Sequence, residues 1–249
     1  FPGRDPEPVP ERLGDLCDLV RATGADLGVA HDGDADRATF VDERGAAVDG
    51  DAALAAFAAA ELGDGDVAVS AANVSRRVRD AVEAAGARLA LTPIGSTHIA
   101  TRVRELRAEG ERVPLAGEGN GGVFFPPYRL ARDGAYTAVR FLELVADRPA
   151  SAVLDPYRGY QSVRVNVPYE SDAERATMLA AAERYARESA AETTTIDGYR
   201  LDFEDAWVLA RASGTEPVVR VVAEASDPDR AADLAGEVAD ALRAAATET

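Results

Sequence analysis

The stretch LGVAHDGDADRATFV, Leu27 to Val41, decides the fold of the first part of the chain, because it places three aspartates in a short loop between two apolar runs. Asp32, Asp34 and Asp36 stand at alternate positions, and Gly33 lets the backbone turn, so their carboxylates can converge on one hard cation. The pattern predicts a strand, a metal-binding loop and a second strand. A solvated acidic turn between two strands is the alternative, because a short motif by itself is only a hypothesis.

Two other kinds of acidic loop have similar spacing. An EF-hand places ligands at positions one, three and five, and Glu43 falls at position twelve counted from Asp32, but position six must be Gly and is Arg37 here. A phosphatase with a nucleophilic aspartate would need a hydroxyl or small apolar residue at the place of Asp36. The EF-hand is therefore excluded, and a metal-dependent phosphatase is kept as an alternative enzyme.

The composition indicates a globular protein with an acidic surface. The chain has 249 residues, 47% of them hydrophobic, and its net charge of −17 comes from 27 basic and 44 acidic residues, with every basic residue an arginine. Such a surface would repel phosphate backbones, so neither a nucleic acid nor an anionic membrane is expected as a partner. An acidic surface without lysine is typical of a protein kept soluble at high salt, so we expect a halophilic source.

The cysteine content and the apolar runs indicate a cytoplasmic location. Cys17 is the only cysteine, which excludes an internal disulfide, and its surroundings LGDLCDLV predict a small buried residue of a helix. No apolar run approaches the length of a membrane span, and no signal peptide is visible. The sequence begins at Phe1 without a methionine, so we expect a fragment of a longer protein.

Three regions with different patterns follow one another. Residues 1–46 combine a proline-rich extended segment with one helix and two strands, too little to close a core. Residues 47–152 alternate helix and strand, which is typical of a complete three-layer α/β domain with a parallel sheet. Residues 153–249 combine several strands with two long helices, which indicates an α+β domain with an antiparallel sheet. The fold class is therefore α/β, a partial unit and then a complete one, followed by the α+β domain.

Apolar periodicity, together with the positions of Gly and Pro, predicts the individual elements. Helices are predicted at residues 13–23, 51–62, 74–85, 99–109, 135–145, 172–188 and 229–245. Strands are predicted at residues 26–30, 39–42, 67–70, 88–92, 113–116, 161–167, 199–203, 206–210 and 218–223.

A phosphate site is predicted in the loop RASGTEPVVR, residues 211–220. Ser213, Gly214 and Thr215 offer two hydroxyls and closely approachable backbone N–H groups, while Arg211 and Arg220 supply forked donors. These groups could cradle a phosphate, although SGTEP is also a good sequence for a tight hairpin turn. In so acidic a chain, two arginines that frame hydroxyls favour the anion site.

Two further loops carry polar groups suited to a ligand. In GEGNGG, residues 117–122, Glu118 can accept hydrogen bonds from vicinal hydroxyls and Asn120 can donate and accept, as sugar recognition requires. In TPIGSTHIA, residues 92–100, His98 stands at a helix start, where it could touch an anion or shuttle a proton. A glycine turn without a ligand and an ordinary capping histidine are the simpler alternatives.

Three of these loops, DGDADR, GEGNGG and RASGTEP with Arg220, follow in this order, and together they resemble those of the α-D-phosphohexomutases, the family that includes phosphoglucomutase and phosphomannomutase. The resemblance spans nearly the whole chain. It implies a four-domain enzyme with an active site in the cleft between domains, in which a phosphoserine of the first domain, ligated to Mg²⁺, gives its phosphoryl group to a hexose phosphate. The resulting bisphosphate turns over and returns the other phosphoryl group to the serine.

The resemblance also implies a role for each region and for each matching residue. Residues 1–46 would be the C-terminal part of the metal-binding domain, residues 47–152 the sugar-recognition domain and residues 153–249 the phosphate-binding domain. The implied site residues are the metal ligands Asp32, Asp34 and Asp36, the catalytic residues Arg37 and His98, and the substrate-binding residues Glu118, Asn120, Arg211, Ser213, Gly214, Thr215 and Arg220.

The sequence departs from the family pattern at three places. It contains no phosphoserine loop with a Ser-His pair, and it has Asn120, Gly121 and Gly122 where Ser, Gly and His are common, which leaves the preferred hexose open. A lysine common near the sugar site cannot occur here, so Arg102 or His98 is expected to replace it. We therefore expect a piece of a mutase that needs the phosphoserine domain as its partner and is inactive alone; a non-catalytic module that binds sugar phosphate or a divalent cation is the alternative.

Overall fold

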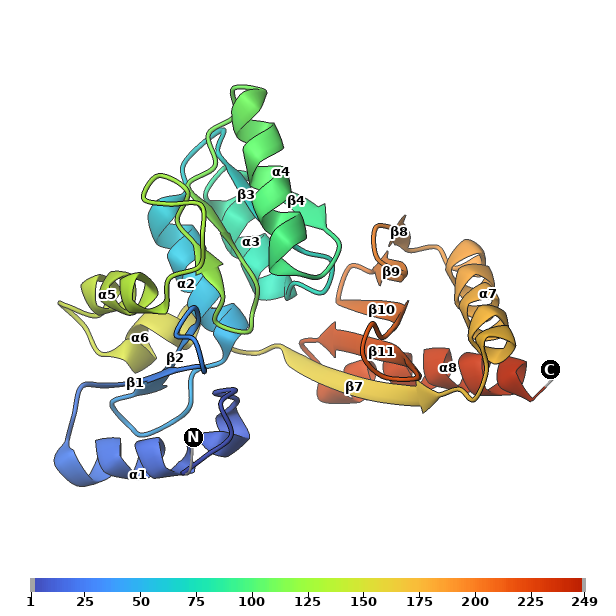
Figure 1. The fold of residues 1–249 in the computed structure, drawn as a ribbon, viewed down its shortest axis with the longest axis horizontal. Helices are drawn as coiled ribbons and strands as arrows, with labels where there is room; N and C mark the ends of the chain where they lie inside the picture. Colours follow the sequence, from blue (N-terminus) through green and yellow to red (C-terminus); the bar gives the residue numbers. More distant parts are fainter. Residues whose placement is uncertain (1–2, 248–249) are drawn as a thin grey trace. The chain divides into compact units, whose positions relative to one another are not determined.

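The chain forms two compact units, Phe1–Arg158 and Gly159–Thr249, in a computed structural model that describes residues 3–247 (Figure 1). Phe1 and Pro2, the start of the predicted extended segment, lie outside the described residues. Within this described part, no helix is both long enough and apolar enough to cross a membrane.

The first unit begins with a helix and a β-hairpin. Helix α1 (Gly14–Thr23) ends at Gly24, whose left-handed backbone (φ 66°) suits a glycine cap. Strands β1 (Leu27–His31) and β2 (Ala38–Asp42) pair antiparallel around the aspartate loop, as the sequence predicts. Cys17 is buried in the small core between α1 and the hairpin, which confirms its predicted place in a helix.

The proline-rich segment before α1 is not extended throughout, so this prediction is wrong in part. Residues Pro10–Arg12 form a 3₁₀ turn, η1, with Pro10 at its first position. Proline is favoured there because its fixed φ suits the start of a helix. It also lacks a backbone N–H, and the N–H at this position would have no hydrogen-bond partner within the helix.

A four-stranded sheet lies at the centre of the rest of this unit. Its strands, in the order β4-β3-β5-β6, are β3 (Val67–Ala71), β4 (Arg88–Thr92), β5 (Leu115–Gly117) and β6 (Val123–Phe124). β3 runs parallel to β4 and β5, and β6 runs antiparallel to β5. The helices are α2 (Gly50–Glu61), α3 (Arg76–Ala84), α4 (Ser96–Ala108), α5 (Gly134–Leu144) and α6 (Ala150–Leu154), followed by the 3₁₀ turn η2 (Asp155–Tyr157).

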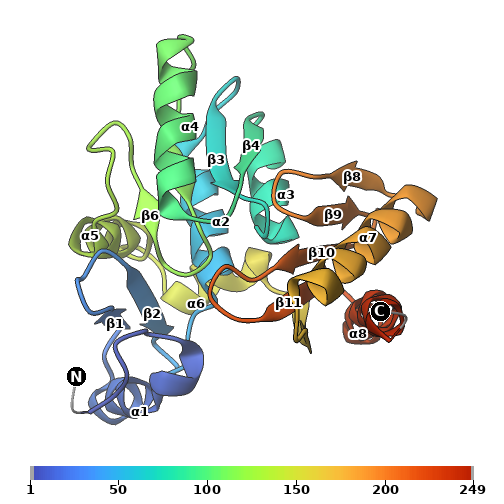
Figure 2. The ribbon, with the colours of Figure 1, turned by 45° about the vertical axis from the view of Figure 1, so that its right-hand side comes forward.

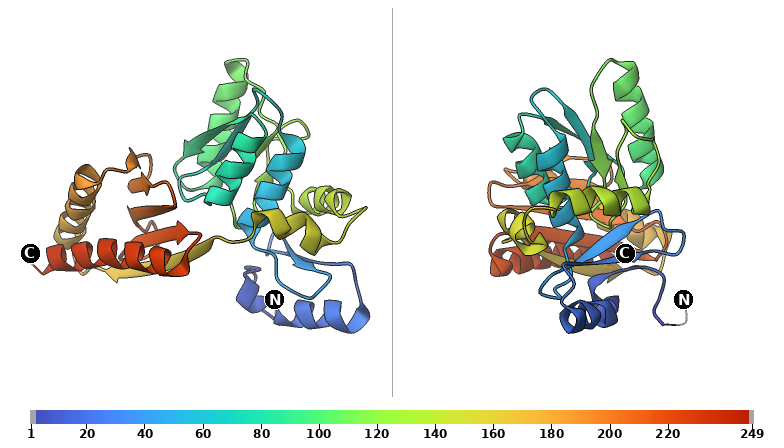
Figure 3. Two further views of the ribbon diagram at one scale, coloured as in Figure 1. Left: turned by 180° about the vertical axis from the view of Figure 1, so that it is seen from behind. Right: turned by 90° about the vertical axis from the view of Figure 1, so that its left-hand side faces the viewer.

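Helices cover both faces of this sheet, which confirms the predicted three-layer arrangement. Side chains of α2 and α3 belong to the core on one face, and side chains of α4 belong to the core on the other. The right-hand view of Figure 3 shows α4 across the sheet from α2 and α3. The sequence does not predict β6 and α6, because two and five residues are too few to establish a period.

Aromatic side chains join the hairpin to the α/β part. Phe40 of β2 stacks on Phe141 of α5 with ring centroids 4.0 Å apart, and Phe57 of α2 meets Phe141 edge-on at 5.8 Å. All three side chains are fully buried. The hairpin and the sheet therefore share one core, which holds the aspartate loop in place relative to the loops of the α/β part.

The second unit is a five-stranded antiparallel sheet with two long helices, as predicted. The strands, in the order β7-β11-β10-β9-β8, are β7 (Gln161–Pro168), β8 (Glu192–Thr194), β9 (Tyr199–Asp202), β10 (Ala206–Ala212) and β11 (Val218–Ala225). Helices α7 (Asp172–Glu188) and α8 (Pro228–Ala246) pack against each other and against the sheet (Figure 2). Only the three-residue strand β8 is missed by the sequence pattern.

Candidate functional site

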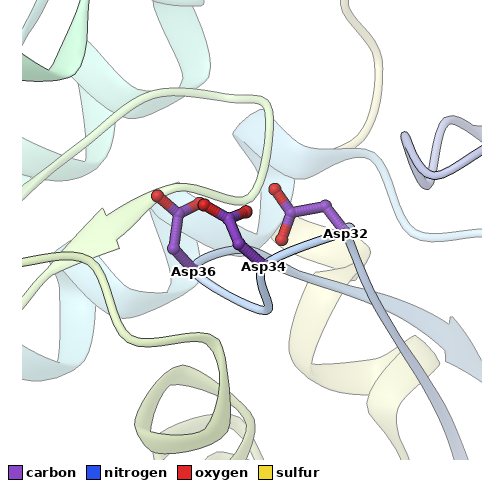
Figure 4. A group of neighbouring side chains, drawn as sticks. All are labelled: Asp32, Asp34 and Asp36. Carbon is purple, nitrogen blue, oxygen red and sulfur yellow. The ribbon is translucent and has the colours of Figure 1, made fainter.

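The three aspartates of the loop between β1 and β2 gather their carboxylates on one side of the loop (Figure 4). Each carboxylate offers an oxygen within 4.8 Å of the oxygens offered by the other two. Asp32 is buried, Asp36 is half-buried and Asp34 is exposed. Ala35 turns the loop with a left-handed backbone (φ 57°), a conformation that residues other than glycine rarely adopt and that is typical of functional loops.

Arg37 fixes the carboxylate of Asp32. Its Nε donates to Asp32 Oδ2 at 2.6 Å, and its backbone N donates to Asp32 Oδ1 at 3.1 Å. Burial acts to raise the pKa of Asp32, but the hydrogen bonds and charge of Arg37 outweigh it, so the pKa lies below its usual value. Asp32 is therefore ionised at neutral pH, as a ligand of a hard cation must be.

Asp36 has one carboxylate oxygen without a hydrogen bond from the described residues. Its Oδ1 is buried, lies 3.8 Å from Arg37 Nε and accepts no hydrogen bond from residues 3–247, while its Oδ2 accepts one from Arg132. Burial of a carboxylate oxygen without a hydrogen bond is costly, and a cation bound at this loop would satisfy it. Three carboxylates are the oxygen donors that Mg²⁺ prefers. The residues of this loop therefore fit a hard divalent cation such as Mg²⁺.

The loop GEGNGG joins β5 to β6 and touches the aspartate loop directly. Gly121 O accepts a hydrogen bond from Ala38 N at 3.1 Å. Gly121 has a left-handed backbone (φ 86°), and a Cβ there would lie 2.5 Å from Ala38 O, so only glycine allows this approach. Glu118 is 8% exposed, and Asn120 Oδ1 accepts from Gly122 N at 3.0 Å, which leaves the amide NH₂ of Asn120 to meet a hydroxyl.

A third segment, at the start of α5, completes this junction. Gly134 N donates to Ala35 O at 3.1 Å, and a Cβ on Gly134 would lie 2.5 Å from Arg37 O. Next to it, Asp133 caps α5 by accepting from Tyr136 N at 3.0 Å. Arg132, just before this cap, reaches Asp36 across 96 positions of sequence. Arg132 is not identified from the sequence, because no sequence pattern near Asp36 or Arg132 indicates a contact between residues 96 positions apart.

The two residues expected to replace the family lysine both lie on α4. His98 is exposed in the first turn of that helix. Arg102 pairs with Glu105 at 3.0 Å and with Glu109 at 3.7 Å along the same helix. A further arginine, Arg132, meets Asp36 of the aspartate loop.

The predicted phosphate loop lies in the second unit, between β10 and β11. Ser213 shapes the turn, since its Oγ accepts from the backbone N of Thr215 at 3.4 Å and of Glu216 at 3.3 Å. Gly214 and Thr215 are exposed at its tip. The Ser213 side chain therefore stabilises the turn through these hydrogen bonds, and Thr215 is exposed at the surface.

The two arginines of this loop face each other. Arg211 and Arg220 are direct partners in the antiparallel register of β10 and β11. Arg211 lies 3.4 Å from Asp197, and Arg220 donates to Glu216 at 2.6 Å and to Asn166 at 3.2 Å. The sequence-predicted arginines are therefore brought together at the base of the turn, with carboxylates as their present partners.

Family comparisons match three consecutive domains of one family along the chain. Residues 1–45 match phosphoglucomutase/phosphomannomutase alpha/beta/alpha domain II, residues 49–160 match alpha/beta/alpha domain III, and residues 163–241 match the C-terminal domain. The chain therefore belongs to the phosphoglucomutase/phosphomannomutase family.

Curated relatives have similar sequences over almost the whole chain. A probable phosphoglucosamine mutase of Methanopyrus kandleri is 38% identical over 98% of the chain and 53% of its own length. A phosphoglucomutase/phosphomannomutase of Thermococcus kodakarensis is 37% identical over 93% of the chain and 50% of its own length. The chain thus spans about half the length of the curated relatives that it matches.

Solved structures have the same fold. A phosphoglucomutase/phosphomannomutase family protein of Burkholderia thailandensis aligns with a TM-score of 0.78 and 30% identity, covering 96% of this chain and 51% of that one. An N-acetylphosphoglucosamine mutase of Aspergillus fumigatus, solved in complex with GlcNAc-6P and magnesium, aligns with a TM-score of 0.57 and 21% identity, covering 92% and 53%. The second likeness concerns the fold alone.

Proposed function

We propose that this chain carries the cation-binding, sugar-binding and phosphate-binding loops of a phosphohexomutase. Such an enzyme is an intramolecular phosphotransferase that interconverts hexose 1-phosphate and hexose 6-phosphate through a phosphoserine and a bisphosphate. The observation that carries the proposal is the hydrogen bond between Ala38 and Gly121, which joins a loop of three convergent carboxylates to the loop GEGNGG. A cation site in contact with a sugar-recognition loop suits phosphoryl transfer to a sugar, which depends on positioning and charge neutralisation.

The aspartate loop would hold the metal in this reaction. Asp32, Asp34 and Asp36 are the proposed ligands of Mg²⁺, which when bound neutralises charge on the phosphoryl group. Arg37 keeps Asp32 oriented and ionised through its two hydrogen bonds. Its guanidinium is also proposed to meet the phosphoryl group that is transferred.

The other loops would bind the hexose phosphate. Glu118 and Asn120 are proposed to read the sugar hydroxyls, because a carboxylate accepts from vicinal hydroxyls and an amide can donate to one. In the second unit, a phosphate is proposed to bind Arg211, Arg220 and the turn formed by Ser213, Gly214 and Thr215. His98, exposed at the start of α4, is proposed as a proton shuttle.

The 249 residues are proposed to be inactive without a phosphoserine domain. Their sequence contains no Ser-His pair that could carry the phosphoryl group between the two positions of the sugar. A further domain of the same protein is the proposed partner. The hexose could be glucose, mannose or glucosamine, since relatives are named for each, and one hydroxyl or amine is a small difference for a sugar loop to discriminate. The proposed compartment is the cytoplasm, where a buried, unpaired Cys17 is stable.

Binding and turnover test this proposal separately. Purified protein is titrated with glucose, mannose and glucosamine 1-phosphates in the presence of Mg²⁺ and followed by ³¹P NMR, with Glu118→Gln as the variant. We expect sugar-phosphate binding by the wild type, weaker binding by Glu118→Gln, and no 6-phosphate product. Robust product formation would contradict the proposed inactivity, and equal binding of inorganic phosphate and sugar phosphates would contradict sugar recognition.

The phosphatase alternative makes a different chemical prediction. It requires Asp32 or Asp34 to attack phosphorus and form a covalent aspartyl phosphate. Both oxygens of Asp32 already accept hydrogen bonds from Arg37, which weakens this carboxylate as a nucleophile. Mass spectrometry of the acid-quenched protein after incubation with hexose phosphate distinguishes the two, since only the phosphatase would carry the added phosphoryl group.

A further inference from the structure

Arg132 hydrogen-bonds one of the two carboxylate oxygens of Asp36 and not the other. Its Nη2 donates to Asp36 Oδ2, while Oδ1 of the same carboxylate is buried, lies 3.8 Å from Arg37 Nε and accepts no hydrogen bond from the described chain. The two side chains are 20% and 26% exposed, so solvent screens this pair only in part. A carboxylate held at one oxygen cannot turn freely, and its second oxygen keeps a fixed direction.

The side chain of Arg132 is itself held in place. A Cβ added to Gly122 would lie 2.8 Å from Arg132 Cδ and 3.1 Å from Arg132 Nη1. The arginine therefore lies beside the backbone of Gly122, in the loop GEGNGG. The backbone two residues later is tied to the aspartate loop by the bond from Gly134 N to Ala35 O. Arg132 therefore contacts both loops of the proposed site, through its stem on one side and its guanidinium on the other.

We infer that Arg132 is a positioning residue for the cation site. It orients Asp36 so that Oδ1, which within residues 3–247 accepts no hydrogen bond and has only the ion-pair contact with Arg37, is available to a cation, and it ties that orientation to Gly122 of the loop GEGNGG. This inference rests on the proposed function, since it concerns the same three aspartates. Partners that hydrogen-bond a ligating carboxylate from outside typically change metal affinity by roughly 10–100-fold when they are removed.

A simple charge argument predicts the opposite effect. A guanidinium beside a cation site repels the cation, so its removal would raise the affinity if electrostatics alone mattered. Mg²⁺ demands near-ideal octahedral geometry, whereas Ca²⁺ accepts variable geometry and more ligands. Loss of a positioning contact should therefore weaken Mg²⁺ binding and affect Ca²⁺ less, a difference in selectivity that charge alone does not produce.

Arg104 provides a matched control for charge. It lines the same cavity of about 310 Å³ as Asp36 and Arg132, together with the hydroxyls of Ser96 and Thr101. Among the described residues it makes no hydrogen bond or ion pair with Asp36. Arg104→Gln thus removes one positive charge from the cavity without removing the contact that orients Asp36.

The experiment measures cation binding directly in the full 249-residue chain. Mn²⁺ is titrated and followed by water proton relaxation, and Mg²⁺ and Ca²⁺ are then added as competitors. We expect Arg132→Gln to weaken Mg²⁺ about tenfold and Ca²⁺ by less, and Arg104→Gln to leave both within about twofold. Gly122→Ala changes no charge, and its Cβ would lie 2.8 Å from Arg132 Cδ and 3.0 Å from Asn120 Oδ1. Because Asn120 is not a proposed cation ligand, this variant should reproduce the loss in Mg²⁺ affinity through the displaced Arg132 stem.

The outcomes separate the inference from the proposed site. If Asp34→Asn weakens Mn²⁺ binding but Arg132→Gln binds Mg²⁺ as tightly as the wild type or more tightly, the positioning role is refuted and the cation site stands. If the wild type and Asp34→Asn bind Mn²⁺ alike, the cation site and the positioning role are both refuted. Circular dichroism of each variant verifies the fold, and Gly122→Ala keeps the test decisive if Arg132→Gln does not fold.

Discussion

Arg211 on β10 lies directly opposite Arg220 on β11, and each guanidinium has its own acidic neighbour. Asp197 lies 3.4 Å from Arg211, and Glu216 lies 2.6 Å from Arg220. Like charges at a cross-strand pair are destabilising, so such a pair needs compensation from carboxylates or from a bound anion. In the proposed function, a phosphate would take the place of one of these side-chain carboxylates at the base of the β10–β11 turn.

Arg220→Gln should weaken the binding of glucose 1-phosphate at least tenfold. If Arg220 binds the phosphate as proposed, the variant removes a charge-assisted hydrogen bond worth about 1.5–3 kcal/mol, and about 1.4 kcal/mol corresponds to a factor of ten. The measurement is a ³¹P NMR titration. Arg164→Gln is the control. Arg164 is exposed on the neighbouring strand β7, and its substitution removes the same charge. An equal loss in both variants would show that only net charge matters.

Gly134→Ala should destabilise the protein by about 1–3 kcal/mol. The added Cβ would lie 2.5 Å from Arg37 O and 2.7 Å from Ala35 O, and backbone atoms cannot move aside without distorting the aspartate loop. Urea unfolding followed by circular dichroism measures the change. Gly236→Ala in α8 is the control, since no heavy atom lies within 4 Å of its added Cβ, and it should stabilise by up to about 1 kcal/mol.

Phe141→Ala should lower the free energy of unfolding by about 3–5 kcal/mol, because it empties the centre of the aromatic cluster with Phe40 and Phe57. The same variant should weaken Mn²⁺ binding, since the stacked pair holds β2 against α5. Val139→Ala, on the exposed side of α5, should change stability by less than about 0.5 kcal/mol. Similar decreases in the free energy of unfolding for Phe141→Ala and Val139→Ala would contradict the central position of Phe141 in the aromatic cluster.

Tyr185 should make stability fall at alkaline pH. Burial raises the pKa of Tyr185 to about 12, helped by its hydrogen bond to Glu237 and the charge of that residue. The unfolded chain ionises this phenol near pH 10, so the neutral form contributes stability below pH 10 that is lost as pH rises toward 12. The difference in urea midpoint between wild type and Tyr185→Phe, measured from pH 9 to 12, should decrease over this window. A difference in urea midpoint that does not change with pH would contradict the raised pKa of Tyr185.

Much of the fold was predictable because its signals are local. The alternation of helix and strand in residues 47–152 and the long helices α7 and α8 follow from apolar periodicity. The short elements β6, α6 and β8 were not predictable, because their hydrogen bonds and packing come from neighbours distant in sequence.

The candidate site divides in the same way. Asp32 and Arg37 are close in sequence, and their hydrogen bonds lie within one turn. The partner of Asp36 is 96 positions away, and the sequence favoured Arg102 or His98 for a neighbouring role. Many arginines of an acidic chain could reach a carboxylate, so residue type alone cannot select one.

By itself, the sequence determined the three polar loops, since the spacing of DGDADR, the glycines of GEGNGG and the hydroxyls of RASGTEP are properties of consecutive residues. Only the tertiary structure decided that Arg132 meets Asp36 and that Gly121 meets Ala38. The physical reason is the shared core of Phe40, Phe57 and Phe141, which brings β2, α2 and α5 together and with them loops that are distant along the chain.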